Sequence, residues 1–166
     1  MNQDDPATLV YLGLGSNIQP EIYLQKAVRH IGQLLTIKAV SSVWQSEAVG
    51  TEGPDFLNAV LAVSTDLSLD ELKSQVTSTI EEKLERVRTE DKYAPRTIDI
   101  DVLVYKGQVV DPEVWLYAHH AVPMAEIAPS IAHPDTGESI RTIADRLILY
   151  SGIIHRPDIL TPSHTL

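Results

Sequence analysis

The stretch "TIDIDVLVY", Thr97–Tyr105, decides the fold and raises the question of function. It is rich in β-branched and apolar residues and has no proline or glycine, which predicts a β-strand. Because side chains alternate along a strand, Asp99 and Asp101 share one face with Thr97 and Leu103. The opposite face is expected to be apolar throughout: Ile98, Ile100, Val102 and Val104. One strand thus joins a core face to a face with two carboxylates.

The segments before this strand predict the rest of a β-α-β-β-α-β order. Apolar runs at 8–15, 37–49 and 56–65 are typical of strands. The spacing of apolar residues over 20–35 predicts an amphipathic helix, and a capping box at Ser68–Glu71 opens a second one. The stripe of that second helix is Leu69, Leu72, Val76, Ile80 and Leu84. We therefore expect an α+β, ferredoxin-like core with both helices on one face of an antiparallel sheet.

The remainder predicts a short C-terminal α/β extension within the same single domain. "AVPMAEIAP" (121–129) and "IRTIADRLILY" (140–150) indicate short helices, and "AHPDTGES" between them indicates a turn. The expected boundaries are a flexible tail at 1–7, a folded domain at 8–147 and a loosely held tail at 150–166.

Composition excludes several classes of function. The 166 residues suffice for one domain, and a net charge of −10 argues against non-specific binding to nucleic acid or to an anionic membrane. The absence of cysteine excludes disulfides and thiolate metal sites. Neither a signal peptide nor an apolar run long enough to span a bilayer is visible, so a cytoplasmic protein is expected.

Asp99 and Asp101 allow two interpretations. They could be solvated carboxylates on an exposed strand face, although strands disfavour aspartate. Alternatively, they bind a divalent cation, because Cβ atoms two residues apart on a strand are roughly 6.5–7 Å from each other. Mg²⁺ is usually held by one or two carboxylates together with substrate phosphates.

Four cations come just before the two aspartates: Arg86, Arg88, Lys92 and Arg96. A helix end attracts cations through its dipole, which accounts for Arg86 and Arg88. Lys92 and Arg96 lie beyond the expected helix, so the cluster also fits a basic loop beside a metal. Such an arrangement suits a polyphosphate, whose transfer depends on positioning and charge neutralisation.

Two further features are ambiguous. Phe56 and Asn58 share a strand face, where the ring could be core or could stack on a flat heterocycle that the amide recognises. His119 and His120 are adjacent and are expected in a surface loop. A zinc site would need further ligands, and nothing in the sequence brings His133 near.

Four segments together resemble 6-hydroxymethyl-7,8-dihydropterin pyrophosphokinase. They are "YLGLGSN", "PDFLNAV", "ERVR…APRTIDIDVLVY" and "EIAP…HPDTG", and the match extends over about 9–147. The resemblance implies a ferredoxin-like fold and transfer of pyrophosphate from ATP to the pterin hydroxymethyl group, in folate biosynthesis. It also implies small-molecule substrates, two Mg²⁺ ions and a monomer.

The resemblance implies a role for each matching residue. Asp99 and Asp101 would hold the two Mg²⁺ ions, with Asp99 also touching the pterin hydroxyl, and Arg86 and Arg96 would be catalytic. The ATP side would comprise Glu81, Arg88, Lys92, Tyr93, Val102 and His119. The pterin side would comprise Ser46, Val49, Phe56, Asn58 and Asp99. Loops before Pro54 and around Tyr93 would close over the site.

The chain departs from the family's pattern between about 113 and 123. This segment is shorter than usual and lacks the expected phenylalanine and arginine, and Val114 stands at the position of another arginine. Three hypotheses therefore remain: an active pyrophosphokinase, a non-catalytic protein that binds pterin or nucleotide, and a pyrophosphokinase for another hydroxymethyl heterocycle.

Overall fold

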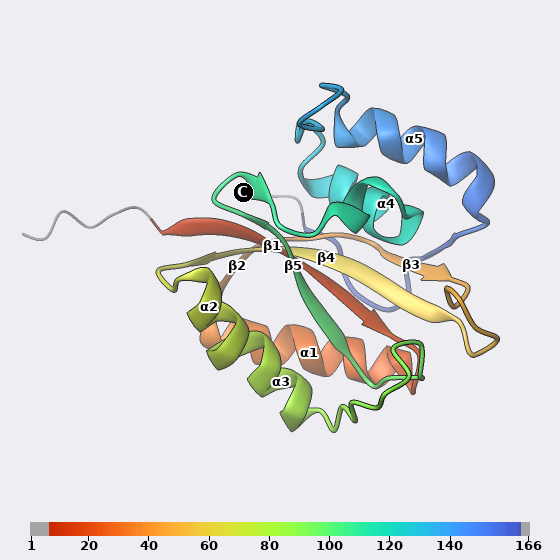
Figure 1. Ribbon diagram of the computed structural model, residues 1–166. Coiled ribbons are helices and arrows are strands. Elements are labelled where there is room, and N and C mark those ends of the chain that lie inside the picture. The colour runs from red at the N-terminus through yellow and green to blue at the C-terminus, as the bar shows by residue number, and fades with distance from the viewer. Residues whose placement is uncertain (1–6, 164–166) are drawn as a thin grey trace, which may run out of the picture.

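The computed structural model describes residues 7–163, and within them an antiparallel sheet of seven strands forms the centre of the molecule (Figure 1). The strand order is β6-β5-β1-β4-β3-β7, and β2 also pairs with β4. The strands are β1 (Thr8–Ser16), β2 (Thr36–Val40), β3 (Val43–Ser46), β4 (Phe56–Thr65), β5 (Asp99–Tyr105), β6 (Gln108–Val109) and β7 (Ile154–Arg156).

Helices cover both faces of the sheet (Figure 1). One face carries α1 (Pro20–Leu34) and the continuous run of α2 (Leu69–Glu71), the π-helical η1 (Leu72–Thr77) and α3 (Ser78–Lys83). The other face carries α4 (Ala118–Ile127) and α5 (Ile140–Ser151), and the 3-10 helix η2 (Pro112–Trp115) precedes α4. The predicted α+β, ferredoxin-like core is confirmed. No helix of residues 7–163 is long and apolar enough to cross a membrane.

Local signals explain the first layer of helices. Pro20 occupies the first turn of α1, and Leu24 and Ile31 are fully buried against the sheet. Both hydrogen bonds of the predicted capping box between Ser68 and Glu71 are present. From Leu72 to Leu84 the apolar stripe repeats every four residues. On a regular helix of 3.6 residues per turn, a stripe with this spacing would drift around the helix axis. The π turn of η1 takes up that drift, because it adds a residue to the helical turn.

A bulge in β5 makes one face prediction wrong. Tyr11 lies opposite Val104, but its neighbour Leu12 lies opposite Val102, so Leu103 is the extra residue. Alternation therefore holds only as far as Val102, whose side chain is in the core beneath α1 and α3. Leu103 and Val104 both join the second core, beneath α4 and α5. A bulge of this kind inserts one extra residue into the strand, and the amino-acid composition of the strand gives no sign of it.

The predicted strand at 37–49 is divided into β2 and β3. Both pair with β4, and the break falls at Ser41 and Ser42. The Ser41 hydroxyl donates a hydrogen bond to the Ser42 carbonyl and accepts one from the Val60 amide, each 2.8 Å long. Serine side chains can compete in this way with the backbone ladder.

The prediction of a loosely held tail at 150–166 is wrong for the part that the structure describes. Residues of β7 pair with β3, and the Ile159 side chain is buried. Val40 and Ser163 exchange two backbone hydrogen bonds of 2.6 and 2.8 Å. The predicted tail at 1–7 falls almost wholly outside the described residues, as do residues 164–166.

Glu126 ties α4 to the sheet. Its carboxylate accepts hydrogen bonds from the Ser42 amide (2.9 Å) and from Nε1 of Trp44 (2.6 Å). We expect Glu126→Ala to lower the free energy of unfolding by about 1–3 kcal/mol, because it leaves partly buried donors without an acceptor. Urea denaturation followed by circular dichroism measures this. The exposed Glu82→Ala is the control and should stay within about 0.5 kcal/mol of wild type. Equal stabilities for the two variants would contradict this role.

Candidate active site

Two cavities meet at Asp99 and Asp101. The first has a volume of about 300 Å³, and the second about 510 Å³. Predicted site residues that line the first are Ser46, Val49, Phe56, Asn58, Lys92, Tyr93, Arg96 and His119. Those that line the second are Glu81, Arg86, Arg88 and Val102. Both cavities include the two aspartates, so the structure brings together all the residues predicted for the site.

A glycine forms the floor of the first cavity. Gly15 on β1 lies between Asn58 on β4 and Asp99 on β5. A Cβ atom at Gly15 would come within 3.5 Å of Oδ1 of Asn58 and 3.7 Å of the Phe56 ring. The missing side chain therefore leaves room above β1 for a flat ligand.

Asn58 is held in one orientation. Its Nδ2 donates to the Trp44 carbonyl (3.0 Å) and to the Ser46 hydroxyl (2.9 Å). Both donor positions of the amide are thus used by the protein, and Oδ1 remains as an acceptor. Phe56 lies directly opposite Ser46 in the ladder and lines the same cavity. An aromatic ring next to a fixed amide suits a planar heterocycle with hydrogen-bonding edges.

Two arginines hold Asp99. Arg86 Nη1 lies 2.5 Å from Oδ1 of Asp99, and Arg96 Nη1 lies 3.2 Å from Oδ2. Only 10% of the Arg86 side chain and 16% of the Arg96 side chain are exposed. Arg86 also lies 3.0 Å from the buried Glu81. The positive charge at the cavity boundary is therefore fixed by several partners before any ligand arrives.

Glu81 organises the second cavity from beneath. Its Oε1 accepts a hydrogen bond from the Ile100 amide at 2.9 Å, and its Oε2 pairs with Arg88 at 2.6 Å. With Arg86 as a third partner, the carboxylate is fully engaged by the protein. It thereby holds both arginines at the second cavity, which Glu81 itself also lines.

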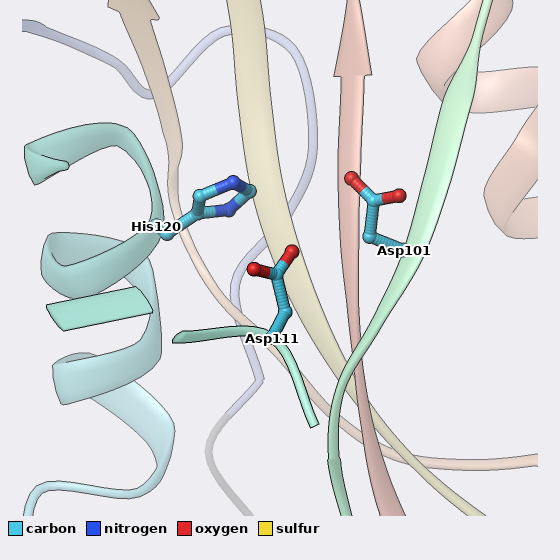
Figure 2. Close-up of side chains that lie close together, drawn as sticks. All are labelled: Asp101, Asp111 and His120. Atoms are coloured by element: carbon cyan, nitrogen blue, oxygen red, sulfur yellow. The ribbon is translucent and has the colours of Figure 1, made fainter. Parts of the chain in front are cut away.

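Asp101 has a different environment from Asp99. Within residues 7–163 it forms no ion pair with an arginine or lysine. Burial, followed by the neighbouring charges of Asp99 and Asp111, raises the pKa of Asp101 to about 7. Asp111 and His120 lie close to it, on the segment before η2 and on α4 (Figure 2). Asp101 is thus a carboxylate that lacks a compensating cation.

The expectation that His119 and His120 lie in a surface loop is wrong. Both are on the first turn of α4 and line the first cavity. Burial lowers the pKa of His119 to about 3 and that of His120 to about 4, so both imidazoles are neutral near pH 7. The histidines are not in a surface loop because Ala118 and Ala121 of α4 pack on the sheet. This packing turns the polar side of the helix toward the aspartates.

The shortened segment still supplies an aromatic wall. Tyr117 and His119 are stacked, with ring centroids 5.3 Å apart, and both line the first cavity. Val114 is 1% exposed in the second core and contributes no side chain to either cavity. Sequence reasoning missed Tyr117, His120 and Asp111. One available signal was Asp111–Pro112, which opens η2 through a hydrogen bond from the Glu113 amide.

Comparisons with known proteins agree with these features. A family model described as "7,8-dihydro-6-hydroxymethylpterin-pyrophosphokinase (HPPK)" matches residues 11–129. A "2-amino-4-hydroxy-6-hydroxymethyldihydropteridine pyrophosphokinase" of Methylorubrum extorquens is 38% identical over 152 residues, covering 84% of this chain and 94% of its own. The protein with the same name in Aquifex aeolicus is 36% identical over 135 residues, covering 75% and 83%.

The fold has solved relatives as well. The crystal structure of wild-type Plasmodium falciparum HPPK-DHPS superposes with a TM-score of 0.69 at 11% identity. The match covers 87% of this chain and 42% of that one. At this identity the likeness concerns the fold alone, and the chain spans less than half of that larger protein.

Proposed function

The chain belongs to the 7,8-dihydro-6-hydroxymethylpterin-pyrophosphokinase family, and we propose that it performs the family's reaction at the junction of its two cavities. The reaction is transfer of pyrophosphate from ATP to 6-hydroxymethyl-7,8-dihydropterin in folate biosynthesis. One observation carries the assignment to this site: Asp99 and Asp101 line both cavities. An acceptor in one cavity and a donor in the other would therefore meet at the carboxylates.

The residues that line the two cavities support the binding of a different substrate in each. We assign the pterin to the cavity with Phe56 and Asn58, where a ring can stack and a fixed amide oxygen can accept a hydrogen bond. Ser46 and Val49 line the same cavity and belong to this side. The ATP phosphates are assigned to the cavity with Arg86 and Arg88.

The remaining predicted ATP-side residues are divided between the cavities. Glu81 acts by holding Arg86 and Arg88, while Val102 lines the second cavity. Lys92, Tyr93 and His119 line the first cavity, so we place them where the two substrates meet.

Tyr117 and His119 offer a replacement for the phenylalanine missing from the shortened segment. Their stacked pair lines the pterin cavity with Phe56. We propose that the heterocycle lies between Phe56 and this pair, so that an aromatic wall remains on each side. This arrangement supports pterin binding despite the shortened segment.

The mechanism follows from the charges at the junction. The hydroxymethyl oxygen attacks the β-phosphorus of ATP and loses its proton to water. The bond from that phosphorus to the α-phosphate oxygen breaks, so AMP leaves. Arg86 and Arg96 face the position where negative charge grows. Asp99 and Asp101 fit the carboxylate ligands of Mg²⁺, and we propose two ions there. When bound, Mg²⁺ neutralises phosphate charge.

The oligomeric state, location and partners that we propose are those expected from the sequence. We propose that the chain acts as a monomer, because both cavities are formed by residues of a single chain. We also propose that it acts in the cytoplasm. Its substrates are small molecules, and its net charge of −10 does not favour nucleic acid or anionic membranes as partners.

An AMP-release assay tests the proposed function. The protein is incubated with ATP and Mg²⁺, with and without 6-hydroxymethyl-7,8-dihydropterin, and AMP is quantified. We expect AMP to form only with the pterin. Pterin affinity without AMP would identify a non-catalytic binder. ATP affinity without pterin affinity would indicate another hydroxymethyl heterocycle as the acceptor.

Two loops meet over the pterin cavity at Gly50 and Tyr93. Gly50 has φ +76°, and a Cβ atom there would lie 2.7 Å from the Tyr93 ring. We expect Gly50→Ala to raise the KM for pterin severalfold, because the loops can no longer approach each other. Gly107→Ala is the matched control, since Gly107 has φ +73° with nothing within 4 Å. Equal KM values in steady-state assays of the two variants would contradict this role.

A further inference from the structure

Asp101, Asp111 and His120 form a cluster that the pyrophosphoryl transfer proposed above does not fully use. One ligand atom from each residue lies within 4.8 Å of the other two. The residues come from β5, the segment before η2 and α4, and their side chains point into a common space (Figure 2). Three successive parts of the chain thus place two carboxylates and one imidazole around one point.

Within residues 7–163 these groups are only partly satisfied, since the Asp111 carboxylate accepts one hydrogen bond, from the Glu113 amide at 3.0 Å. In residues 7–163 the His120 ring makes no side-chain hydrogen bond, although it is largely buried and points toward the carboxylates. Asp101 and Asp111 have like charges at close range, and the arginines beside them are bound to Asp99 and Glu81. A pair of like charges at close range is costly. A cation at the centre would remove this cost, and the His120 ring faces the same point.

The geometry points to a divalent-cation site in which Asp101, Asp111 and His120 bind a first-row transition metal ion without ATP. The inference rests on the proposed function for the role of Asp101 as a metal ligand. It adds two ligands, Asp111 and His120, and a preference of the site for one class of metal.

The ligand types determine this preference. Carboxylate oxygens suit Mg²⁺, Ca²⁺ and Mn²⁺, whereas imidazole suits transition metals such as zinc, iron and nickel. Mg²⁺ is held mainly by oxygen and keeps several waters, so a neutral imidazole contributes little to its binding. A site with two oxygens and one nitrogen should therefore prefer Mn²⁺ to Mg²⁺, and His120 should be the source of that preference.

Titration with Mn²⁺ in the absence of nucleotide tests this inference. Electron paramagnetic resonance measures the free ion, and Mg²⁺ serves as the competitor. We expect one Mn²⁺ per chain, bound at least about tenfold more tightly than Mg²⁺. Loss of even an outer partner of a metal ligand typically costs 10–100-fold in affinity, so His120→Asn should weaken Mn²⁺ binding by at least about tenfold. Binding of Mg²⁺ should change little.

His119→Asn is the matched control for metal binding, because it removes the neighbouring imidazole, which is not part of the cluster. It should keep the Mn²⁺ affinity of wild type. Asp111→Asn provides a second test of the cluster, and the thermal midpoint of each metal-free variant verifies that it is folded. Absence of nucleotide-free Mn²⁺ binding in the wild type would overturn the inference, as would unchanged binding in folded His120→Asn and Asp111→Asn. AMP release with Mg²⁺ is measured separately, so failure of the proposed function is distinguishable from failure of this site.

Discussion

Replacing Asp101 with asparagine is expected to lower kcat for pterin-dependent AMP release by at least about 10³-fold. Removal of one preorganised electrostatic contact already costs about 10²–10³-fold in well-studied sites. Asp101 lines both cavities and forms no ion pair with an arginine among residues 7–163, so its carboxylate is available for a metal ion. Asparagine keeps the shape of the side chain but removes this charge.

The control for this loss is Asp145→Asn, which removes an exposed carboxylate from α5. Its kcat should match that of wild type. Circular dichroism and thermal unfolding show whether both variants are folded. A folded Asp101→Asn that retains activity close to wild type would contradict the assignment of Asp101 as a metal ligand.

Replacing Arg86 with methionine is expected to have two large effects. Arg86 bridges Glu81, whose side chain is 5% exposed, and Asp99, whose side chain is 25% exposed. Loss of one partner of a buried ion pair typically costs about 3–5 kcal/mol of stability. Loss of a charge-stabilising arginine in phosphoryl transfer costs about 10³-fold or more in kcat. Urea denaturation and steady-state AMP release measure the two effects.

Arg88→Met is the control that shows whether the burial of Arg86 matters, or whether any arginine beside Glu81 has the same effect. Arg88 binds the same glutamate at 2.6 Å, but 68% of its side chain is exposed. Exposed ion pairs contribute about 0–1 kcal/mol, so the stability of this variant should remain near wild type. Equal destabilisation by Arg86→Met and Arg88→Met would show that burial of Arg86 between two carboxylates does not matter.

Local patterns in the sequence predict the core and half of the site. Alternation in β5 places Asp99 and Asp101 on one face, and apolar spacing defines α1 and the helix that opens at Ser68. These features depend on neighbours within a few residues, so one sequence is enough to find them. The predicted convergence of the basic segment on the aspartates follows, because Arg96 is joined to the strand by a short connection.

Features that depend on packing between distant segments could not be predicted in this way. The local amino-acid composition gives no sign of the bulge at Leu103 or of the break at Ser41. The approach of Asp111 and His120 to Asp101 depends on how α4 packs on the second face of the sheet. Order in the C-terminal segment depends on pairing between β7 and β3, which no local pattern encodes.

Phosphorus NMR of a single reaction mixture tests the central claim most directly. ATP, Mg²⁺ and 6-hydroxymethyl-7,8-dihydropterin are followed with the wild-type protein. We predict equal amounts of AMP and a pterin diphosphate, because the bond that breaks lies between the α-phosphate oxygen and the β-phosphorus. Formation of ADP and a pterin monophosphate would contradict the account. No pterin-dependent change of ATP in the presence of the folded protein would contradict it as well.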